Sequence, residues 1–157
     1  MSVITLENRI NIAGGKVVEL QELIKAVPCV QYSMNIAGVA VTMDLHKMHC
    51  VLVEHVDGSY GIITEKDIIR KVVARCRDPL TIQAWEIMTR PLITADIETD
   101  IHDAIVLMRE ANVRNLVVTL HGRILGIVKR STILNSLKFD EEEYWTMTAH
   151  SQNQTKV

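Results

Sequence analysis

The stretch Gly61-Ile62-Ile63-Thr64-Glu65-Lys66-Asp67 combines a glycine, two branched apolar residues, and a hydroxyl and a carboxylate three residues apart. Ile62-Ile63 predicts the end of a buried strand, and Thr64 predicts the start of a helix. Backbone N–H groups at a helix start are unpaired and partly positive, which favours an anion such as phosphate. Thr64 offers a hydroxyl donor, and Asp67 offers a carboxylate that can accept hydrogen bonds from a vicinal diol such as ribose. The stretch therefore has the features of a nucleotide site.

The same spacing also has a purely structural interpretation. Thr64-x-x-Asp67 is the spacing of a helix capping box, although Asp is a less usual partner than Glu or Gln. Taken alone, seven residues of this kind more often cap a helix than bind a ligand. The choice between the two interpretations depends on the rest of the chain.

Composition limits the classes of function that this chain can have. The 157 residues carry a net charge of −2 and are 48% hydrophobic, and the mean hydropathy is +0.14. The absence of clustered Lys and Arg disfavours recognition of long nucleic acid or of a membrane surface. The N-terminus predicts no signal peptide, and no apolar run approaches the ~18 residues of a membrane span. Three unpatterned cysteines indicate reduced thiols in a cytoplasmic protein.

Hydrophobic periodicity and turn residues predict alternating helices and strands. The expected helices span residues 16–25, 36–43, 65–75, 82–88, 101–111 and 131–137. The expected strands span residues 29–32, 50–53, 60–63, 92–95, 116–118 and 124–128. The residue pairs Met43/Met108, Val53/Val118, Gly61/Gly126 and Ile68/Ile133 are each 65 residues apart, which indicates an internal duplication.

The duplication predicts an α/β fold with two βαββα repeats packed face to face about a pseudo-twofold axis, because one repeat is too small to bury its own sheet. One extra residue between Gly122 and Gly126 absorbs a difference in turn length. The predicted division is an N-terminal helical extension at residues 1–22, repeats at 23–78 and 79–138, and an acidic and polar tail at 139–157.

Several segments resemble a tandem CBS-domain pair, or Bateman module. They include Glu86-Ile87-Met88-Thr89-Arg90-Pro91-Leu92-Ile93-Thr94, Ala104-Ile105-Val106-Leu107-Met108, Val113-Arg114-Asn115-Leu116-Val117-Val118 and the stretches that begin at Gly61 and Gly126. The resemblance covers about residues 23–138. It implies that adenosine derivatives (AMP, ADP, ATP or S-adenosylmethionine) bind in the clefts between the repeats and regulate an attached or partner protein.

The stretch from Gly61 to Asp67 matches the ligand signature of the family throughout. The resemblance implies that Asp67 holds the ribose hydroxyls, that Thr64 meets ribose or the α-phosphate, and that Ile62 packs beside the adenine. Ile63 and Gly61 complete this motif. Val30 and Gln31 would offer backbone groups to the base edge. His49 and Arg114 hold the positions of a basic residue that reaches the phosphates, and Arg114 is the better candidate because a guanidinium stays charged.

The second repeat departs from this signature. Lys129 replaces the expected Thr and Thr132 replaces the expected Asp, so a second cleft lacks the carboxylate that the resemblance assigns to ribose. Lys129, Arg130 and Ser131 nevertheless put positive charge and a hydroxyl at a helix start. We expect one competent cleft, built from Thr64, Asp67, Arg114 and the Lys129–Ser131 turn, while a solvated basic face is the alternative for Lys129 and Arg130.

Other chemistry has weaker support. His46-x-x-His49-Cys50 lacks a second ligand pair at zinc-site spacing, so no metal site is predicted. Nothing local activates a Cys or Ser nucleophile. Tyr144-Trp145 lies in a tail whose default is a solvated terminus, although it could instead dock on a neighbouring subunit.

The predicted function is a stand-alone, non-catalytic sensor that binds AMP, ADP or ATP, with S-adenosylmethionine also open. It needs no cofactor, forms a homodimer and is cytoplasmic, and it regulates an unidentified protein partner. Two alternatives stay open: a nucleotide-independent interaction scaffold, and a redox-responsive or metal-responsive regulator that uses Cys29, Cys50 and His49.

Overall fold

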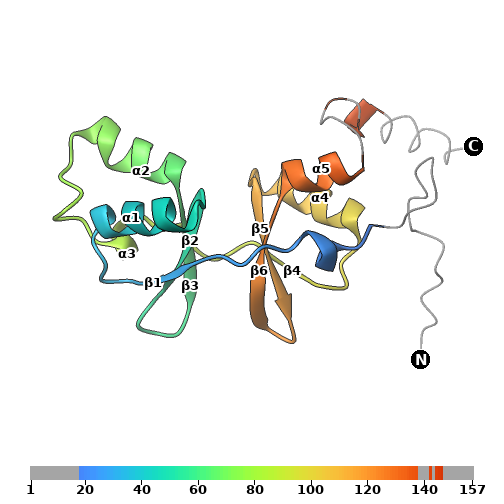
Figure 1. The fold of residues 1–157 in the computed structure, drawn as a ribbon, viewed down its shortest axis with the longest axis horizontal. Coiled ribbons are helices and arrows are strands. Elements are labelled where there is room, and N and C mark those ends of the chain that lie inside the picture. Colours follow the sequence, from blue (N-terminus) through green and yellow to red (C-terminus); the bar gives the residue numbers. More distant parts are fainter. Residues whose placement is uncertain (1–17, 138–141, 143, 147–157) are drawn as a thin grey trace, which may run out of the picture. The chain divides into compact units, whose positions relative to one another are not determined.

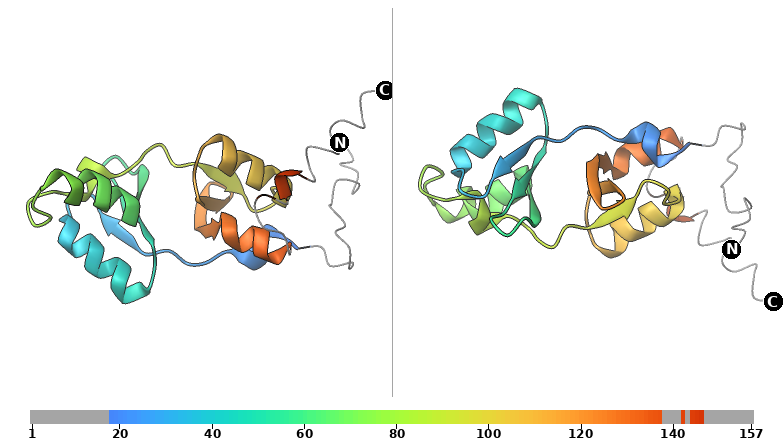
Figure 2. Two further views of the ribbon diagram at one scale, coloured as in Figure 1. Left: turned by 90° about the horizontal axis from the view of Figure 1, so that it is seen from above. Right: turned by 90° about the horizontal axis from the view of Figure 1, so that it is seen from below.

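The computed structural model describes residues 18–137, 142 and 144–146. The chain forms two compact units: unit 1 comprises Met1–Lys25 and Ile93–Val157, and unit 2 comprises Ala26–Leu92. Each unit contains one three-stranded sheet with helices on one of its faces (Figure 1 and Figure 2). The predicted α/β class, with two copies of one βαββα pattern, is confirmed.

Unit 2 is built on the sheet β1-β2-β3. Its elements in chain order are β1 (Cys29–Gln31), α1 (Ile36–His46), β2 (Cys50–Glu54), β3 (Tyr60–Thr64), α2 (Glu65–Lys71), the 3-10 helix η3 (Val73–Arg75) and α3 (Ala84–Ile87). Strand β1 is parallel to β2, and β3 is antiparallel to β2. Val51, Val53 and Ile63 are almost fully buried and pack with Ile36 and Val39 of α1 in one core. Burial of this apolar face fixes the strand register.

Unit 1 repeats the arrangement with the sheet β4-β5-β6. Its elements are the 3-10 helix η2 (Leu20–Leu23), β4 (Thr94–Asp96), α4 (Ile101–Glu110), β5 (Asn115–Leu120), β6 (Arg123–Lys129) and α5 (Arg130–Ser136). The pairing of β5 with β6 shifts between Val118 and Thr119, which pair with Gly126 and Ile124. Leu125 is thus the extra residue of a β-bulge. The predicted extra residue before Gly126 is confirmed.

Each unit also includes a segment that precedes the other repeat in sequence. Lys25 pairs with Ile127 of unit 1, and Thr89 pairs with Ile62 of unit 2, each as an isolated antiparallel bridge. The described residues before Ala26 therefore pack with the second repeat, and residues 79–92 pack with the first. The boundaries at residues 22/23 and 78/79 follow the sequence repeat, whereas the compact units change at 25/26 and 92/93.

Several predicted elements need correction. The expected helix over residues 16–25 is wrong in its described part: only η2 is helical there, because Lys25 is held extended by two backbone hydrogen bonds of 2.9 Å to Ile127. The expected helix over residues 65–75 is broken after Lys71, where the branched Val72 and Val73 begin the turn into η3. The helix expected over 82–88 is limited to α3, and the strand expected at 92 begins at Thr94.

The described residues of the C-terminal segment pack on unit 1. Tyr144 is 2% exposed and belongs to the core that includes Ile105 and Leu134, and its hydroxyl hydrogen-bonds Nδ1 of His102. The guanidinium of Arg109 lies 4.1 Å from the centre of the Trp145 ring, a cation–π contact. The default prediction of a solvated terminus is therefore wrong for Tyr144, which contacts its own chain.

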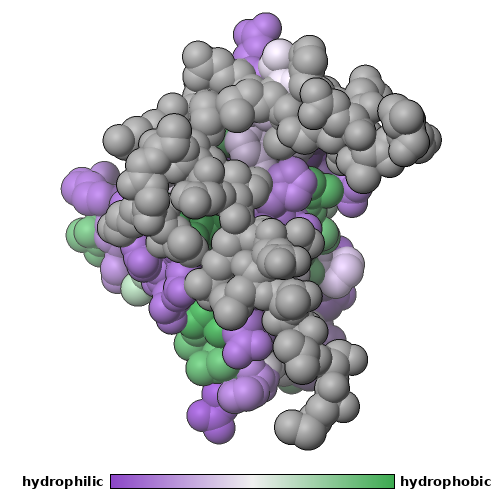
Figure 3. Space-filling model, turned by 90° about the vertical axis from the view of Figure 1, so that its right-hand side faces the viewer, coloured by the Kyte–Doolittle hydropathy of each residue, from purple (hydrophilic) through white to green (hydrophobic). Residues whose placement is uncertain are grey.

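The outer surface of the described residues is mixed in character. Where described residues are visible in Figure 3, hydrophilic side chains predominate and hydrophobic ones form small groups. None of the helices in the described part of the chain has the length and hydrophobicity that a membrane span requires.

Candidate functional site

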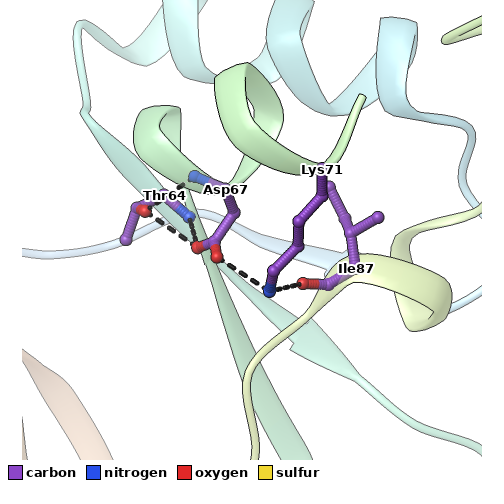
Figure 4. Close-up of polar contacts among 4 residues, drawn as sticks. All are labelled: Thr64, Asp67, Lys71 and Ile87. Carbon is purple, nitrogen blue, oxygen red and sulfur yellow. Dashed lines mark hydrogen bonds and ion pairs between the residues drawn. The ribbon is translucent and has the colours of Figure 1, made fainter. Parts of the chain in front are cut away.

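The two polar residues of the Gly61–Asp67 stretch bind each other. Oδ2 of Asp67 accepts hydrogen bonds from the Thr64 backbone N–H at 2.9 Å and from its hydroxyl at 2.8 Å. In return, the Asp67 N–H donates to Oγ1 of Thr64 at 3.3 Å (Figure 4). This is the reciprocal capping box that the spacing allows, so the structural interpretation of Thr64-x-x-Asp67 is confirmed.

The other carboxylate oxygen of Asp67 contacts Lys71, one helical turn further on. Nζ of Lys71 lies 2.9 Å from Oδ1 of Asp67, and it also donates a hydrogen bond of 2.6 Å to the carbonyl oxygen of Ile87 (Figure 4). Ile87 is the last residue of α3, whose terminal carbonyls lack partners within the helix. Lys71 therefore ties the start of α2 to the end of α3. Sequence analysis missed it, although its (i, i+4) spacing from Asp67 is a recognisable signal.

The start of α2 is a weak anion site in its own right. The helix has only seven residues, and its first turn carries Glu65 and Asp67. These carboxylates already interact favourably with the positive end of the short helix dipole. Phosphate binding would have to rely on basic side chains rather than on this helix end.

The predicted residues of β1 and β3 divide between the two faces of the sheet. Val30 and Ile63 are buried in the core beneath the helices, at 5% and 0% exposure, so only their backbone groups can meet a ligand. Ile62 and Gln31 lie on the opposite face because side chains alternate along a strand. Gly61 lies on the helix side, against Met88.

Glu54 is a polar neighbour of Gln31 that sequence analysis missed. Its carboxylate accepts hydrogen bonds from Nε2 of Gln31 at 3.1 Å and from the Tyr60 hydroxyl at 3.4 Å. The charge of Glu54 raises the pKa of Tyr60. Burial, and then the same charge, raise the pKa of the Cys29 thiol. The strand pairing Gln31–Glu54–Tyr60 brings these groups together, and only the register of the sheet reveals it.

His49, one of the two candidates for phosphate binding, is already paired. Its Nδ1 lies 3.0 Å from Oε1 of Glu65, and both side chains are exposed. The neighbouring carboxylate would repel a phosphate group, so the geometry disfavours His49 in this role.

The other predicted basic residues lie in unit 1. The Arg130 N–H donates to the Arg114 carbonyl at 2.9 Å, and Lys129 pairs with Asn115 across the sheet. The strand pairing therefore brings the backbones of Arg114, Lys129 and Arg130 close together in space. Ser131 follows in α5. Lys129 makes no side-chain cap at the N-terminus of α5, so the Thr64–Asp67 arrangement has no counterpart there. The role of these residues in phosphate binding stays a prediction.

The described histidines and cysteines do not cluster as metal ligands. Among the residues that the structure describes, no group of three or more His, Cys, Asp or Glu side chains could hold a metal ion. Cys50 is fully buried, while Cys29 and Cys76 are exposed free thiols.

Comparison with known proteins identifies relatives of this chain. The family model described as the CBS domain matches residues 84–138. An uncharacterized protein of Methanopyrus kandleri is 36% identical over 85 residues, which are 54% of this chain and 43% of that protein. Hypoxic response protein 1 of Mycobacterium tuberculosis is 31% identical over 81 residues, which are 52% of this chain and 57% of that protein. This chain spans about half the length of these curated relatives.

Solved structures extend the similarity across both repeats. The hexameric CBS-CP12 protein from bloom-forming cyanobacteria has a TM-score of 0.69 and 31% identity, over 75% of this chain and 70% of that chain. The crystal structure of Hypoxic Response Protein I with two coordinated zinc ions has a TM-score of 0.63 and 26% identity, over 75% of this chain and 98% of that chain.

Proposed function

Because this chain belongs to the CBS-domain family, whose members are generally regulatory modules, we propose that it is a non-catalytic sensor of an adenosine nucleotide. The site is the start of α2 in unit 2, where Asp67 receives the ribose hydroxyls and Thr64 faces the ribose or the α-phosphate. We assign the base to the side of Ile62, which lies on the sheet face opposite the helices. AMP, ADP, ATP and S-adenosylmethionine are the candidate ligands.

The observation that carries this proposal is the orientation of the Asp67 carboxylate. Its side chain is 17% exposed, and two donors of Thr64 hold one of its oxygens in place. A carboxylate that is fixed before the ligand arrives loses little conformational freedom on binding. The Thr64–Asp67 pair, which caps the helix, thus also preorganises an acceptor for a diol.

The same geometry supports one competing function. The capping box is complete without a ligand, so Thr64 and Asp67 are fully explained by helix stability in an interaction scaffold. A redox role for Cys29 has less support, because its raised pKa disfavours the reactive thiolate. A metal role would resemble the zinc-bound relative, but no ligand group of this kind occurs among the described residues.

Self-association is part of the proposed function. One relative is the hexameric CBS-CP12 protein. Unit 2 exposes apolar side chains on its helices, among them Val41, Leu45, Ile69 and Val73, which are 56–73% exposed. We propose that this chain forms at least a homodimer and that occupancy of the nucleotide site alters its binding to a partner protein. A nucleotide can change that affinity only by the ratio of its own affinities for the two states.

Ligand-dependent thermal unfolding tests the proposal. A nucleotide at about 100 times its Kd stabilises the folded state by about 2.7 kcal/mol. We expect this shift with at least one of the four candidate ligands, and we expect Asp67→Asn to abolish it. The matched control is Asp44→Asn, which removes an exposed carboxylate from α1 and should leave the shift intact.

The outcomes separate the two functions. No shift with any of the four ligands would favour the scaffold. A full shift that persists in Asp67→Asn would show that the nucleotide binds elsewhere.

A further inference from the structure

The Asp67 carboxylate has little acceptor capacity left. An ionised carboxylate offers about four positions for hydrogen-bond donors, two on each oxygen. Oδ2 already accepts from the Thr64 N–H and the Thr64 hydroxyl, and Oδ1 pairs with Lys71. One position, on Oδ1, is left for a ligand.

A vicinal diol brings two hydroxyl donors, so one of the present donors must yield if both are to bind Asp67. The Thr64 N–H is fixed as part of the helix cap. In the described contacts, the Thr64 hydroxyl bonds only to Asp67. Lys71 is different, because it already has a second acceptor in the Ile87 carbonyl oxygen, at 2.6 Å.

Lys71 is also free enough to move. Its side chain is 38% exposed, and an ammonium on a flexible four-carbon stem can change one of its three donors at low cost. The Ile87 contact would keep Lys71 tied to α3 after it leaves Asp67. Of the three donors on Asp67, Lys71 is the one that can be displaced most easily.

We propose that Lys71 determines how strongly the site prefers ribose to deoxyribose, by competing with the second ligand hydroxyl for Oδ1 of Asp67. This inference rests on the proposed function and assigns its sugar specificity to one residue. A 2′-deoxynucleotide brings only one hydroxyl and leaves Lys71 in place. A ribonucleotide gains a second hydrogen bond but loses the Lys71–Asp67 ion pair, so the gain is partly offset.

The test is the ratio of the Kd of 2′-deoxy-AMP to that of AMP, measured by calorimetry for the full chain, and likewise for 2′-deoxy-ATP and ATP. The two nucleotides of each pair carry the same charge. The effect of removing the Lys71 cation on the affinity for phosphate therefore cancels in the ratio. In Lys71→Met the position on Oδ1 that Lys71 occupies in the parent protein becomes vacant. We then expect the ratio to rise about tenfold, which corresponds to one hydrogen bond to a charged group. Lys71→Arg retains a cation beside Asp67 and should keep the ratio of the parent protein.

Lys66→Met is the matched control, because it removes an exposed lysine from the same helix and should leave the ratio unchanged. Lys71→Gln provides a second neutral variant if Lys71→Met unfolds, and its ratio should also rise. An unchanged ratio in variants that still bind AMP would overturn the inference and leave the proposed function standing. Loss of all nucleotide binding in Lys71→Met would also overturn it, because Lys71 would then be required rather than competing. If the parent protein binds no nucleotide, both proposals fail.

Discussion

Gly61 lies directly against Met88: a methyl group on the Gly61 Cα would come within 2.7 Å of Met88 Sδ and 3.1 Å of the Thr89 carbonyl oxygen. The equivalent glycine of unit 1, Gly126, packs even more tightly against the Lys25 backbone, because a methyl group there would overlap the Lys25 carbonyl oxygen. Each glycine leaves room for a segment that belongs in sequence to the other repeat and packs against it. The glycine of the ligand signature therefore has a packing role that is independent of any ligand.

Gly61 faces the Met88 side chain most closely, whereas Gly126 faces a backbone carbonyl. Substitution by alanine should therefore cost more stability at Gly126 than at Gly61. Gly126→Ala should cost about 3 kcal/mol, the upper end for overpacking, because a backbone carbonyl cannot rotate away. Gly61→Ala should cost about 1 kcal/mol, since its nearest neighbour is the end of a flexible methionine. The measurement is urea unfolding, followed by Trp85 fluorescence for unit 2 and Trp145 fluorescence for unit 1, each with the other tryptophan changed to Phe.

A double variant provides the control. Adding Met88→Ala to Gly61→Ala should recover part of the lost stability, because the methionine side chain no longer resists the new methyl group. Equal costs at Gly61 and Gly126 would contradict the assignment of the larger overlap to the backbone.

Removing the Tyr144 side chain should destabilise unit 1. Tyr144→Phe removes the hydroxyl, and with it the contact with His102, and should cost about 1 kcal/mol. Tyr144→Ala should cost about 3–5 kcal/mol, because a buried aromatic side chain is lost from the core. Urea unfolding is again the measurement, here followed by circular dichroism so that Trp145→Phe, which changes a partly exposed neighbour, can serve as the milder comparison. Unchanged stability of Tyr144→Ala would show that the C-terminal segment is not part of this core.

Tyr144 also predicts a loss of stability at alkaline pH. Burial, with added effects of Asp100 and Asp103, raises its pKa from the ordinary value of 10.0 to about 12. The unfolded chain therefore loses this proton at lower pH than the folded chain. The stability that neutral Tyr144 contributes is fully present below pH 10 and is lost as the pH rises to about 12.

The difference in unfolding free energy between the parent protein and Tyr144→Phe isolates this effect. We expect the difference to be constant between pH 7 and 9 and to change in favour of Tyr144→Phe above pH 10. A difference that stays constant to pH 12 would mean that Tyr144 ionises equally easily in the folded and unfolded chains.

The sequence was sufficient for the repeat and for the local features of the candidate site. The 65-residue spacing of Gly61 and Gly126 reflects equivalent packing positions, and hydrophobic periodicity places most helices and strands. The capping spacing of Thr64 and Asp67 is likewise a local signal, because both residues belong to the same helix start.

Contacts that depend on tertiary structure were not predictable in this way. Residues near Lys25 have helical spacing, yet pairing with Ile127 overrides the local preference. Glu54 meets Gln31 only through strand register. Tyr144 is buried by a core whose other members range from Leu20 to Leu134. Single-sequence patterns carry no information on which distant segment will cover a given face.

The exposed apolar residues of unit 2 predict a surface for self-association. Leu45 of α1 is 73% exposed and Ile69 of α2 is 58% exposed, and apolar side chains gathered on helices in this way commonly mark protein interfaces. Leu45→Glu and Ile69→Glu should each weaken self-association at least tenfold, because a charge would be buried in the interface.

Sedimentation equilibrium over a range of protein concentrations measures this effect, with thermal unfolding as the check that each variant folds. The matched control is Val56→Glu, which introduces the same charge at a residue that is 72% exposed but lies in the turn between β2 and β3. If Val56→Glu alone dissociates the oligomer, the interface involves the hairpin rather than the helices. If none of the three variants changes the mass distribution, α1 and α2 do not mediate self-association.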